Sequence, residues 1–210
     1  MKNKKRAILA IATLSLLSAC GNKNDATDSN FKEAVQQYLD KRFPMCAIHA
    51  QEFPTKPITS TFHNNIEIYD DLVKIGLMSK KVVQVPVPLL PNKTQPAPVY
   101  DITAEGKKYY KEHDDNTLGK VPGMCGGKAK VADIVNFTQP SDMFGHTISR
   151  VKFTYKVSDI PDWMKLKSIT DYNQEMNKII KADGVAMDGT AILVLTGKGW
   201  MEESVFNAQQ

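Results

Sequence analysis

The body of this 210-residue chain has no excess of either charge. Lysine and arginine number 27 against 23 aspartate and glutamate residues, and the whole difference comes from Lys2, Lys4, Lys5 and Arg6. Beyond residue 19 the two signs therefore balance. A neutral body lacks the concentrated cationic face that sequence-independent nucleic-acid binding requires. We expect no nucleic-acid partner.

The sequence also lacks the common catalytic and metal-binding motifs. Its four histidines form no His-x-x-x-His pair, no cysteine pair has zinc spacing, and no Gly-x-Ser-x-Gly elbow is present. From these absences we predict no catalytic residue, no metal site and no cofactor, and we favour a non-enzymatic role. An active site assembled from distant residues remains the alternative, and its candidates are His49, His63, His146, Asp133 and Cys46.

No apolar run is long enough to cross a bilayer. The longest one, Ala7–Leu17, would form a helix about half as long as a hydrocarbon core of ~30 Å. It follows directly on the basic residues 2–6, and this order of a charged segment and a short apolar segment is typical of a secretion signal peptide. We therefore assign residues 1–19 to a cleaved leader.

The leader ends in Leu17-Ser18-Ala19-Cys20, which closely resembles the lipobox of bacterial lipoprotein precursors. The resemblance implies cleavage before Cys20, a diacylglyceryl thioether on its sulfur and acylation of the new amino terminus. Two or more acyl chains hold a protein stably, so the implied partner is the lipid bilayer. The implied location is the periplasm-facing side of the cell envelope, and Gly21 favours the outer over the inner membrane. The alternative is an ordinary signal peptide followed by a coincidental cysteine.

With Cys20 assigned to lipid, Cys46 and Cys125 remain as an even pair. In an oxidising compartment such a pair favours a structural disulfide. The bridge would close a loop of about 80 residues and contribute on the order of 4 kcal/mol. Two alternatives stay open: two free buried thiols, or a nucleophilic Cys46 whose thiol pKa is lowered by His49.

Residues 21–30 contain no apolar side chain larger than alanine, and a flexible tether is predicted over residues 20–30. The body is expected to begin at Phe31, where apolar residues recur at the spacing of one helical face until Pro44. A second amphipathic helix is predicted over residues 65–77. Two short strands, 81–85 and 99–102, should follow, joined by a stiff loop that carries five prolines.

Two motifs in this region resemble the wing of winged-helix domains. The second predicted helix ends in Gly76-Leu77, and the hairpin after it closes with Tyr100-Asp101-Ile102-Thr103-Ala104-Glu105-Gly106. The resemblance implies a winged-helix-like scaffold. The DNA binding that the family often shows does not carry over, because Glu67, Asp70 and Asp71 would face the phosphates of DNA.

The segment 113–127, which is polar and contains four glycines and a proline, is the best candidate for a domain boundary. Beyond it, strict alternation predicts a strand with one wet face, whose apolar side is Val151, Phe153, Tyr155 and Val157. An amphipathic helix is expected over residues 169–179. Residues 190–196 and 200–205 are expected to form a hairpin that turns at Gly197-Lys198-Gly199.

These patterns predict an α+β protein. Its N-terminal half, 31–118, should be helical and winged-helix-like, and residues 119–210 should form a small antiparallel sheet with one packed helix. Trp163 and Trp200 are candidate binding residues, because tryptophan is enriched at interface anchors, although core packing is the more common role. The loop 86–91 could be an exposed polyproline ligand, but a stiff hairpin loop is favoured.

The function that these features favour is that of a membrane-anchored envelope lipoprotein acting as a non-enzymatic binding or structural module. Its partner would be an envelope protein or a small ligand. Two alternatives remain: a periplasm-facing envelope hydrolase with a site assembled from distant residues, and an immunity or inhibitor lipoprotein.

Overall fold

The computed structural model describes residues 22–59, 65–90, 92–115, 118–143 and 145–209. The α-helices in these ranges are α1 (Asp28–Arg42), α2 (Ile66–Lys74), α3 (Lys167–Thr170), α4 (Gln174–Ala182) and α5 (Glu203–Asn207). Two 3₁₀ helices are η1 (Gly106–Lys108) and η2 (Asp162–Lys165). The strands are β1 (Met45–His49), β2 (Met78–Pro86), β3 (Thr94–Ile102), β4 (Tyr110–Asp115), β5 (Gly119–Gly126), β6 (Lys128–Phe137), β7 (Ser141–Met143), β8 (His146–Ser158), β9 (Met187–Thr196) and β10 (Gly199–Glu202).

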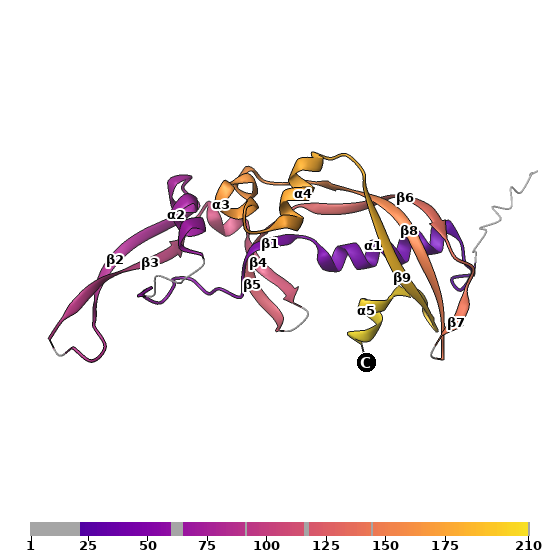
Figure 1. Cartoon of the computed structure of the whole chain (residues 1–210), viewed down its shortest axis with the longest axis horizontal. Helices are drawn as coiled ribbons and strands as arrows, with labels where there is room; N and C mark the ends of the chain where they lie inside the picture. The colour runs from indigo at the N-terminus through magenta and orange to yellow at the C-terminus, as the bar shows by residue number, and fades with distance from the viewer. Residues whose placement is uncertain (1–21, 60–64, 91, 116–117, 144, 210) are drawn as a thin grey trace, which may run out of the picture.

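The strands form three antiparallel sheets that follow one another along the long axis of the molecule (Figure 1). Strands β2 and β3 form a two-stranded sheet at one end. A three-stranded sheet in the middle has the order β1-β5-β4. At the other end lies a five-stranded sheet of order β10-β9-β8-β6, with β7 paired to β8. The molecule is therefore elongated.

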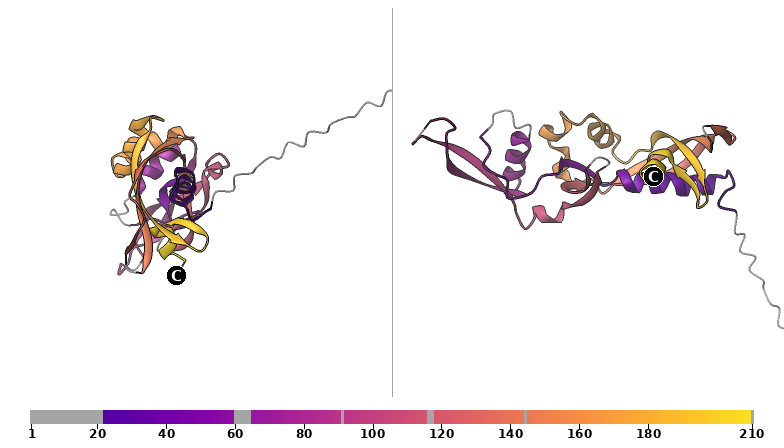
Figure 2. Two further views of the ribbon diagram at one scale, coloured as in Figure 1. Left: turned by 90° about the vertical axis from the view of Figure 1, so that its right-hand side faces the viewer. Right: turned by 90° about the horizontal axis from the view of Figure 1, so that it is seen from below.

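The five-stranded sheet curls around α1, which lies inside its curve when the molecule is viewed along its length (Figure 2). The predicted helical face is confirmed. Phe31, Ala34, Val35 and Leu39 are buried, and they share a core with residues of β6, β8, β9 and β10. At the start of the helix, the side chain of Thr27 accepts a hydrogen bond from the backbone amide of Asn30. The first described helix thus packs on a sheet formed by residues 128–202.

The expected fold class is wrong, because the N-terminal half is not helical. Strand exceeds helix (42% against 28%), and the five α-helices of the described chain are short and spread along it. In the region of the two quoted motifs, β2 and β3 have nine residues each and extend away from the body. The two strands are longer than the expected 81–85 and 99–102, because Pro86, Pro96 and Pro98 lie within β2 and β3 rather than in the connecting loop.

Proline is tolerated in β3 because this strand lies at the edge of its sheet. Pro96 and Pro98 pair with Gln84 and Val82 of β2. On the other edge of β3 the carbonyl of Pro98 accepts a hydrogen bond from the amide of Ile58 at 2.9 Å, and the amide of Tyr100 donates to the Oγ1 of Thr55 at 3.0 Å. Proline lacks a backbone N–H donor, but its carbonyl still accepts hydrogen bonds. The two prolines therefore cost this edge strand little.

The segment predicted as a domain boundary, 113–127, instead forms most of the β4–β5 hairpin. Two of its glycines, Gly123 and Gly126, are needed for close packing. A Cβ atom on Gly126 would lie 2.6 Å from Pro161 and 2.7 Å from the sulfur of Met164. Glycine in a strand often marks such a close approach, and here it was mistaken for a turn signal.

The second core lies between the two smaller sheets and the short helices. It joins residues of β1, β5, α2, β2, β3, η2, α3 and α4, and its large fully buried members include Tyr69, Tyr100 and Met124. Each of the two cores draws residues from both sides of position 118.

Among the described residues, no helix has the length and hydropathy needed to span a membrane.

The predicted helix over 169–179 is interrupted. It consists of α3 and α4, separated by residues 171–173, and the side chain of Asn173 caps α4 by accepting a hydrogen bond from the amide of Met176 at 2.9 Å.

The folded part begins before Phe31, the residue at which the body was expected to start. Asn22–Thr27 are folded against the body, where Trp200 Nε1 donates to the carbonyls of Asn24 (3.1 Å) and Asp25 (3.2 Å).

Candidate functional site

The three-stranded sheet carries the most unusual group of side chains in the described chain. Cys46 of β1 and Cys125 of β5 lie directly opposite one another and form a disulfide. Both residues are buried, with 4% and 1% of their surfaces exposed. The bridge ties the first strand of the chain to a strand 79 residues further on.

Two histidines flank this disulfide on the two outer strands of the sheet. His49 ends β1 and His113 lies in β4, so β5 separates them. Their rings nevertheless meet, with His49 Nδ1 and His113 Nε2 3.2 Å apart, which is hydrogen-bond distance. On its other side, His113 Nδ1 lies 3.8 Å from the sulfur of Cys125. The imidazole of His113 therefore bridges His49 and the disulfide.

Gly123 of β5 makes this arrangement possible. It pairs with His49 across β1 and with Lys111 across β4. A Cβ atom at this position would lie 2.8 Å from His113 Cε1 and 2.5 Å from the carbonyl oxygen of Ile48. Any larger residue would push the His113 ring away, so the glycine leaves room for the imidazole to lie over the middle strand.

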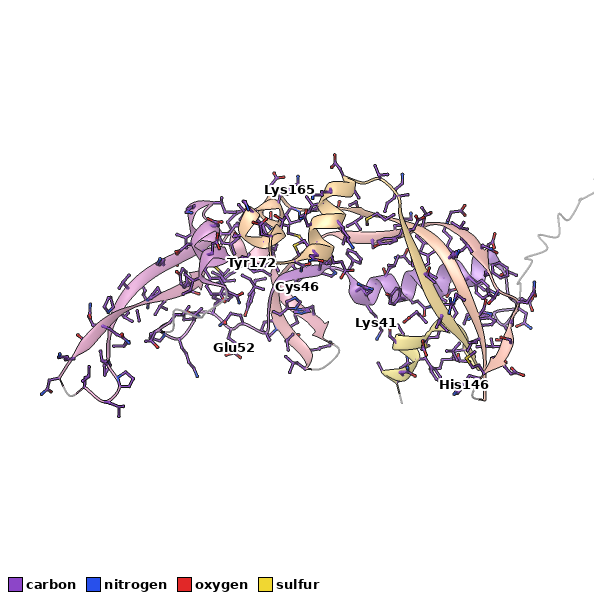
Figure 3. The ribbon with its side chains drawn as sticks, viewed as in Figure 1. Lys41, Cys46, Glu52, His146, Lys165 and Tyr172 are labelled. Carbon is purple, nitrogen blue, oxygen red and sulfur yellow. A yellow bond between two sulfur atoms is a disulfide. The ribbon has the colours of Figure 1, made fainter. Side chains whose placement is uncertain are left out.

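The disulfide and both histidines border a cleft of about 990 Å³. Its walls come from the end of α1, from β1 and β4, from the start of α4, and from β10 and α5. Figure 3 shows Cys46 at the centre of the molecule and Lys41 on the neighbouring end of α1. The charged residues of the wall are of both signs: Asp40, Lys41, Arg42, Lys111, Glu112, Glu175 and Glu202. A cleft of this size can hold a small molecule or a side chain of a partner.

An ion pair between Arg42 and Glu175 spans one side of the cleft, and Arg42 Nη1 also donates to the hydroxyl of Tyr38 at 2.6 Å. Desolvation by itself lowers the pKa of Arg42, but Tyr38 and Glu175 outweigh it and the pKa is raised. The guanidinium is therefore always charged, and it links α1 to α4 at the cleft wall.

The structure brings together two of the residues considered for a hydrolase and places two others elsewhere. Cys46 and His49 border the same cleft, whereas Asp133 is exposed on β6 and the His146 ring packs edge-on against Phe206 at a distance of 5.2 Å. His63 and Cys20 lie outside the described residues. The imidazole that lies next to a sulfur of the disulfide is that of His113 rather than that of His49. Because Cys46 is bonded to Cys125, it has no thiol to act as a nucleophile in this form.

Sequence reasoning missed His113. The residue was placed in a boundary loop, and only the correct assignment of residues 110–126 as a hairpin brings it next to Cys125. Combining the predicted disulfide with that hairpin could have found it, since cross-strand neighbours of a bridged cysteine must lie close to the sulfur.

Both tryptophans are buried, one in each core. Trp200 is 6% exposed and packs against Phe31, while Trp163 is 3% exposed and its ring meets that of Tyr109 edge-on at 5.7 Å. Within the described part of the chain, Trp163 Nε1 has no hydrogen-bond partner. Their surfaces are thus occupied by core contacts.

Three of the exposed large apolar residues lie on the β2–β3 hairpin, which we call the arm (residues 78–102); the others are spread over the rest of the described surface. Leu89 is 98% exposed at its tip, Leu90 is 49% exposed, and Val82 on β2 is 61% exposed. The tip is ordered by hydrogen bonds among its own backbone groups, from Val87 N to Lys93 O at 2.9 Å and from Leu90 N to Val87 O at 3.2 Å. Leu89 has a φ of 65°, an unfavourable conformation for leucine that costs on the order of 1 kcal/mol or more.

Comparisons of the chain with protein-family models, with curated proteins and with solved structures find no match. The site is therefore interpreted from its own geometry.

Proposed function

We propose that the protein is a lipid-anchored, non-enzymatic module of the bacterial cell envelope that binds another envelope protein through the tip of the arm. The anchor would be the acylated Cys20, and Gly21 favours attachment to the outer membrane. The proposal rests on one geometric relationship: the first described residues and the tip of the arm lie at opposite ends of the elongated molecule (Figures 1 and 2).

The anchored end would lie close to the membrane. The chain is folded from Asn22, and Asn22–Thr27 pack beside Trp200, so few residues separate Cys20 from the folded body. The arm extends from the other end and would point away from the leaflet that holds the acyl chains. An apolar tip in that position is available to a protein and is far from the bilayer to which the chain is attached.

The chemistry of the tip favours a protein partner with an apolar pocket. Leu89 is 98% exposed next to backbone hydrogen bonds of the turn, and its apolar side chain could be buried in such a pocket on binding. Lys93 is exposed beside the tip and Lys81 further down the arm, and both would suit an acidic rim around such a pocket, whereas Lys80 is already paired with Asp70. The disulfide and the two cores hold the rest of the molecule as a rigid support.

The test is site-specific photo-crosslinking in intact cells. A photoreactive amino acid at position 89 should give one discrete protein adduct, and Leu90→Asp should weaken it. The same group at Val185, which is apolar and 67% exposed on the loop after α4, serves as the matched control and should give no such adduct. Lipid adducts at position 89, or the same protein adducts at both positions, would contradict the role of the arm.

The anchor is tested separately. Cys20→Ser should move the protein from the membrane fraction to the soluble fraction without changing the crosslink at position 89 in a soluble extract. If the variant stays in the membrane fraction, the lipidation is refuted, whatever the arm binds.

A further inference from the structure

We propose that the Cys46–Cys125–His113 cluster is a zinc site when its disulfide is reduced, with His49 as the residue that orients His113. The sulfurs of Cys46 and Cys125 and a ring nitrogen of His113 all lie within 4.8 Å of one another. Thiolate and imidazole are the ligands that zinc prefers, and three protein ligands with one open position are typical of zinc sites that bind a further molecule.

The distances fit a zinc ion after a small movement. With Zn–S near 2.3 Å and Zn–N near 2.0–2.1 Å, a tetrahedral ion needs its sulfur and nitrogen ligands about 3.5 Å apart and its two sulfurs about 3.8 Å apart. Cys125 Sγ and His113 Nδ1 are 3.8 Å apart. The two sulfurs separate once their bond is broken, and side chains of directly opposed strand residues can span that distance without movement of the backbone.

His49 completes the arrangement. When His113 binds an ion through Nδ1, its Nε2 carries a proton, and this N–H faces His49 Nδ1 at 3.2 Å. Metal-ligating histidines commonly donate their second nitrogen in this way, which fixes the tautomer and the orientation of the ring. Gly123 leaves the space in which the ring is held. Orientation of His113 thus does not depend on the metal.

The site forms in two steps, reduction of the disulfide and binding of the ion. An external dithiol supplies two electrons and two protons to the cystine and becomes a disulfide itself, leaving two thiols on this chain. One Zn²⁺ then displaces both thiol protons and is bound by two thiolates and His113. Cys46 and His113 border the 990 Å³ cleft, which gives the ion an access route and turns its fourth position toward the cleft. The ion links β1 and β5, the same two strands that the disulfide links.

The experiment uses the full chain with Cys20→Ser, which leaves only the two cysteines of the cluster. The protein is reduced, freed of reductant without air, and titrated with Co²⁺, whose thiolate charge-transfer and d–d absorption report a tetrahedral sulfur site. We expect one Co²⁺ per chain, displaced by one Zn²⁺, and no such absorption for the oxidised protein. His49→Ala should weaken Zn²⁺ binding about 10- to 100-fold.

Two further variants decide the assignment. His113→Ala should weaken binding by more than His49→Ala does, and His146→Ala, which removes an exposed imidazole far from the cluster, should have no effect. Circular dichroism of each reduced variant verifies that the fold is retained. The proposal is overturned if the reduced protein shows no thiolate–cobalt absorption, or if His113→Ala binds Co²⁺ as tightly as the parent chain.

Discussion

The ring of Phe31 in α1 meets the indole of Trp200 in β10 edge-on, with their centroids 5.0 Å apart. Phe31 also meets Phe137 of β6 in the same geometry at 4.7 Å. One aromatic side chain of the first helix is therefore held between the two outer strands of the curled sheet. Edge-to-face pairs add to the free energy that burial of the rings already contributes.

Because of this contact, Trp200→Ala should lower the free energy of unfolding by about 3–5 kcal/mol, as expected for an aromatic residue removed from a core. Urea unfolding followed by circular dichroism measures the change. Tyr172→Ala is the control, since Tyr172 is 72% exposed, and it should change stability by less than about 0.5 kcal/mol. Equal effects of the two substitutions would show that Trp200 is not part of the core.

The disulfide predicts the number of reactive thiols. The denatured, unreduced full chain carrying Cys20→Ser should contain no free thiol, and the reduced chain should contain two. Replacing Cys46 and Cys125 together by serine should cost about 2–5 kcal/mol of stability, because the bridge closes a long loop. Two reactive thiols in the unreduced chain would exclude the bridge.

The surroundings of Asp70 predict that the free energy of unfolding depends on pH. Although partial burial by itself raises the pKa of Asp70, hydrogen bonds from Lys80 Nζ and the Tyr100 hydroxyl, both 2.7 Å from Oδ1, outweigh it and hold the pKa below its usual value of 3.8. A carboxyl whose pKa is lower in the folded chain stabilises the fold above its unfolded pKa and loses that contribution as the pH falls through the folded pKa.

We therefore expect Asp70→Asn to lower stability at pH 7 by about 1–2 kcal/mol, which is the range of hydrogen bonds to a charged group (about 1.5–3 kcal/mol) reduced for solvent screening, because the Asp70 side chain is 37% exposed. The difference between parent and variant should shrink below pH 3.8, the usual pKa of this carboxyl. Chemical unfolding at pH 7 and at several lower pH values gives this comparison. A difference that stays constant through that range would show that the carboxylate charge does not contribute.

Gly106 lies where the chain returns from the arm to the body. A Cβ atom there would lie only 2.1 Å from the carbonyl oxygen of Leu77, so the backbone would have to move. The amide of Gly106 also donates to Thr103 Oγ1 at 3.1 Å, and the Thr103 hydroxyl in turn donates to the carbonyl of Gly76 at 2.8 Å.

Gly106→Ala should accordingly destabilise the protein by more than about 2 kcal/mol, since a contact this short requires the backbone to shift. Gly197→Ala is the matched control, because no atom lies within 4 Å of its Cβ position. Its effect on the unfolding midpoint in urea should be small. Similar midpoints for the two variants would contradict the close approach at Gly106.

Local periodicity predicted much of the secondary structure. The apolar side of β8 is confirmed, with Val151, Phe153 and Val157 buried. The β9–β10 hairpin is confirmed as well, with its turn at 197–198, but residues 203–205, which were expected in the second strand, begin α5. These elements could be predicted because side-chain alternation and turn residues are properties of neighbouring positions.

The partners of these elements could not be predicted in the same way. Nothing near Phe31 indicates that α1 packs on β6, β9 and β10 rather than on α2, because an amphipathic helix accepts any apolar face of suitable shape. The middle sheet is a second example, since β1 pairs with β5 across almost 80 residues. The candidate site depends on that long-range pairing, and for this reason only Cys46, Cys125 and His49 of its four members were named from the sequence.

The position of α1 has a consequence for biogenesis. A polypeptide that emerges N-terminus first, from a ribosome or from a translocation channel, exposes Phe31 long before β10 exists to cover it. The core around α1 cannot close until about residue 200 has followed. Until then α1 has no complete sheet to pack against, so the leading segment of the nascent chain lacks a stable fold of its own.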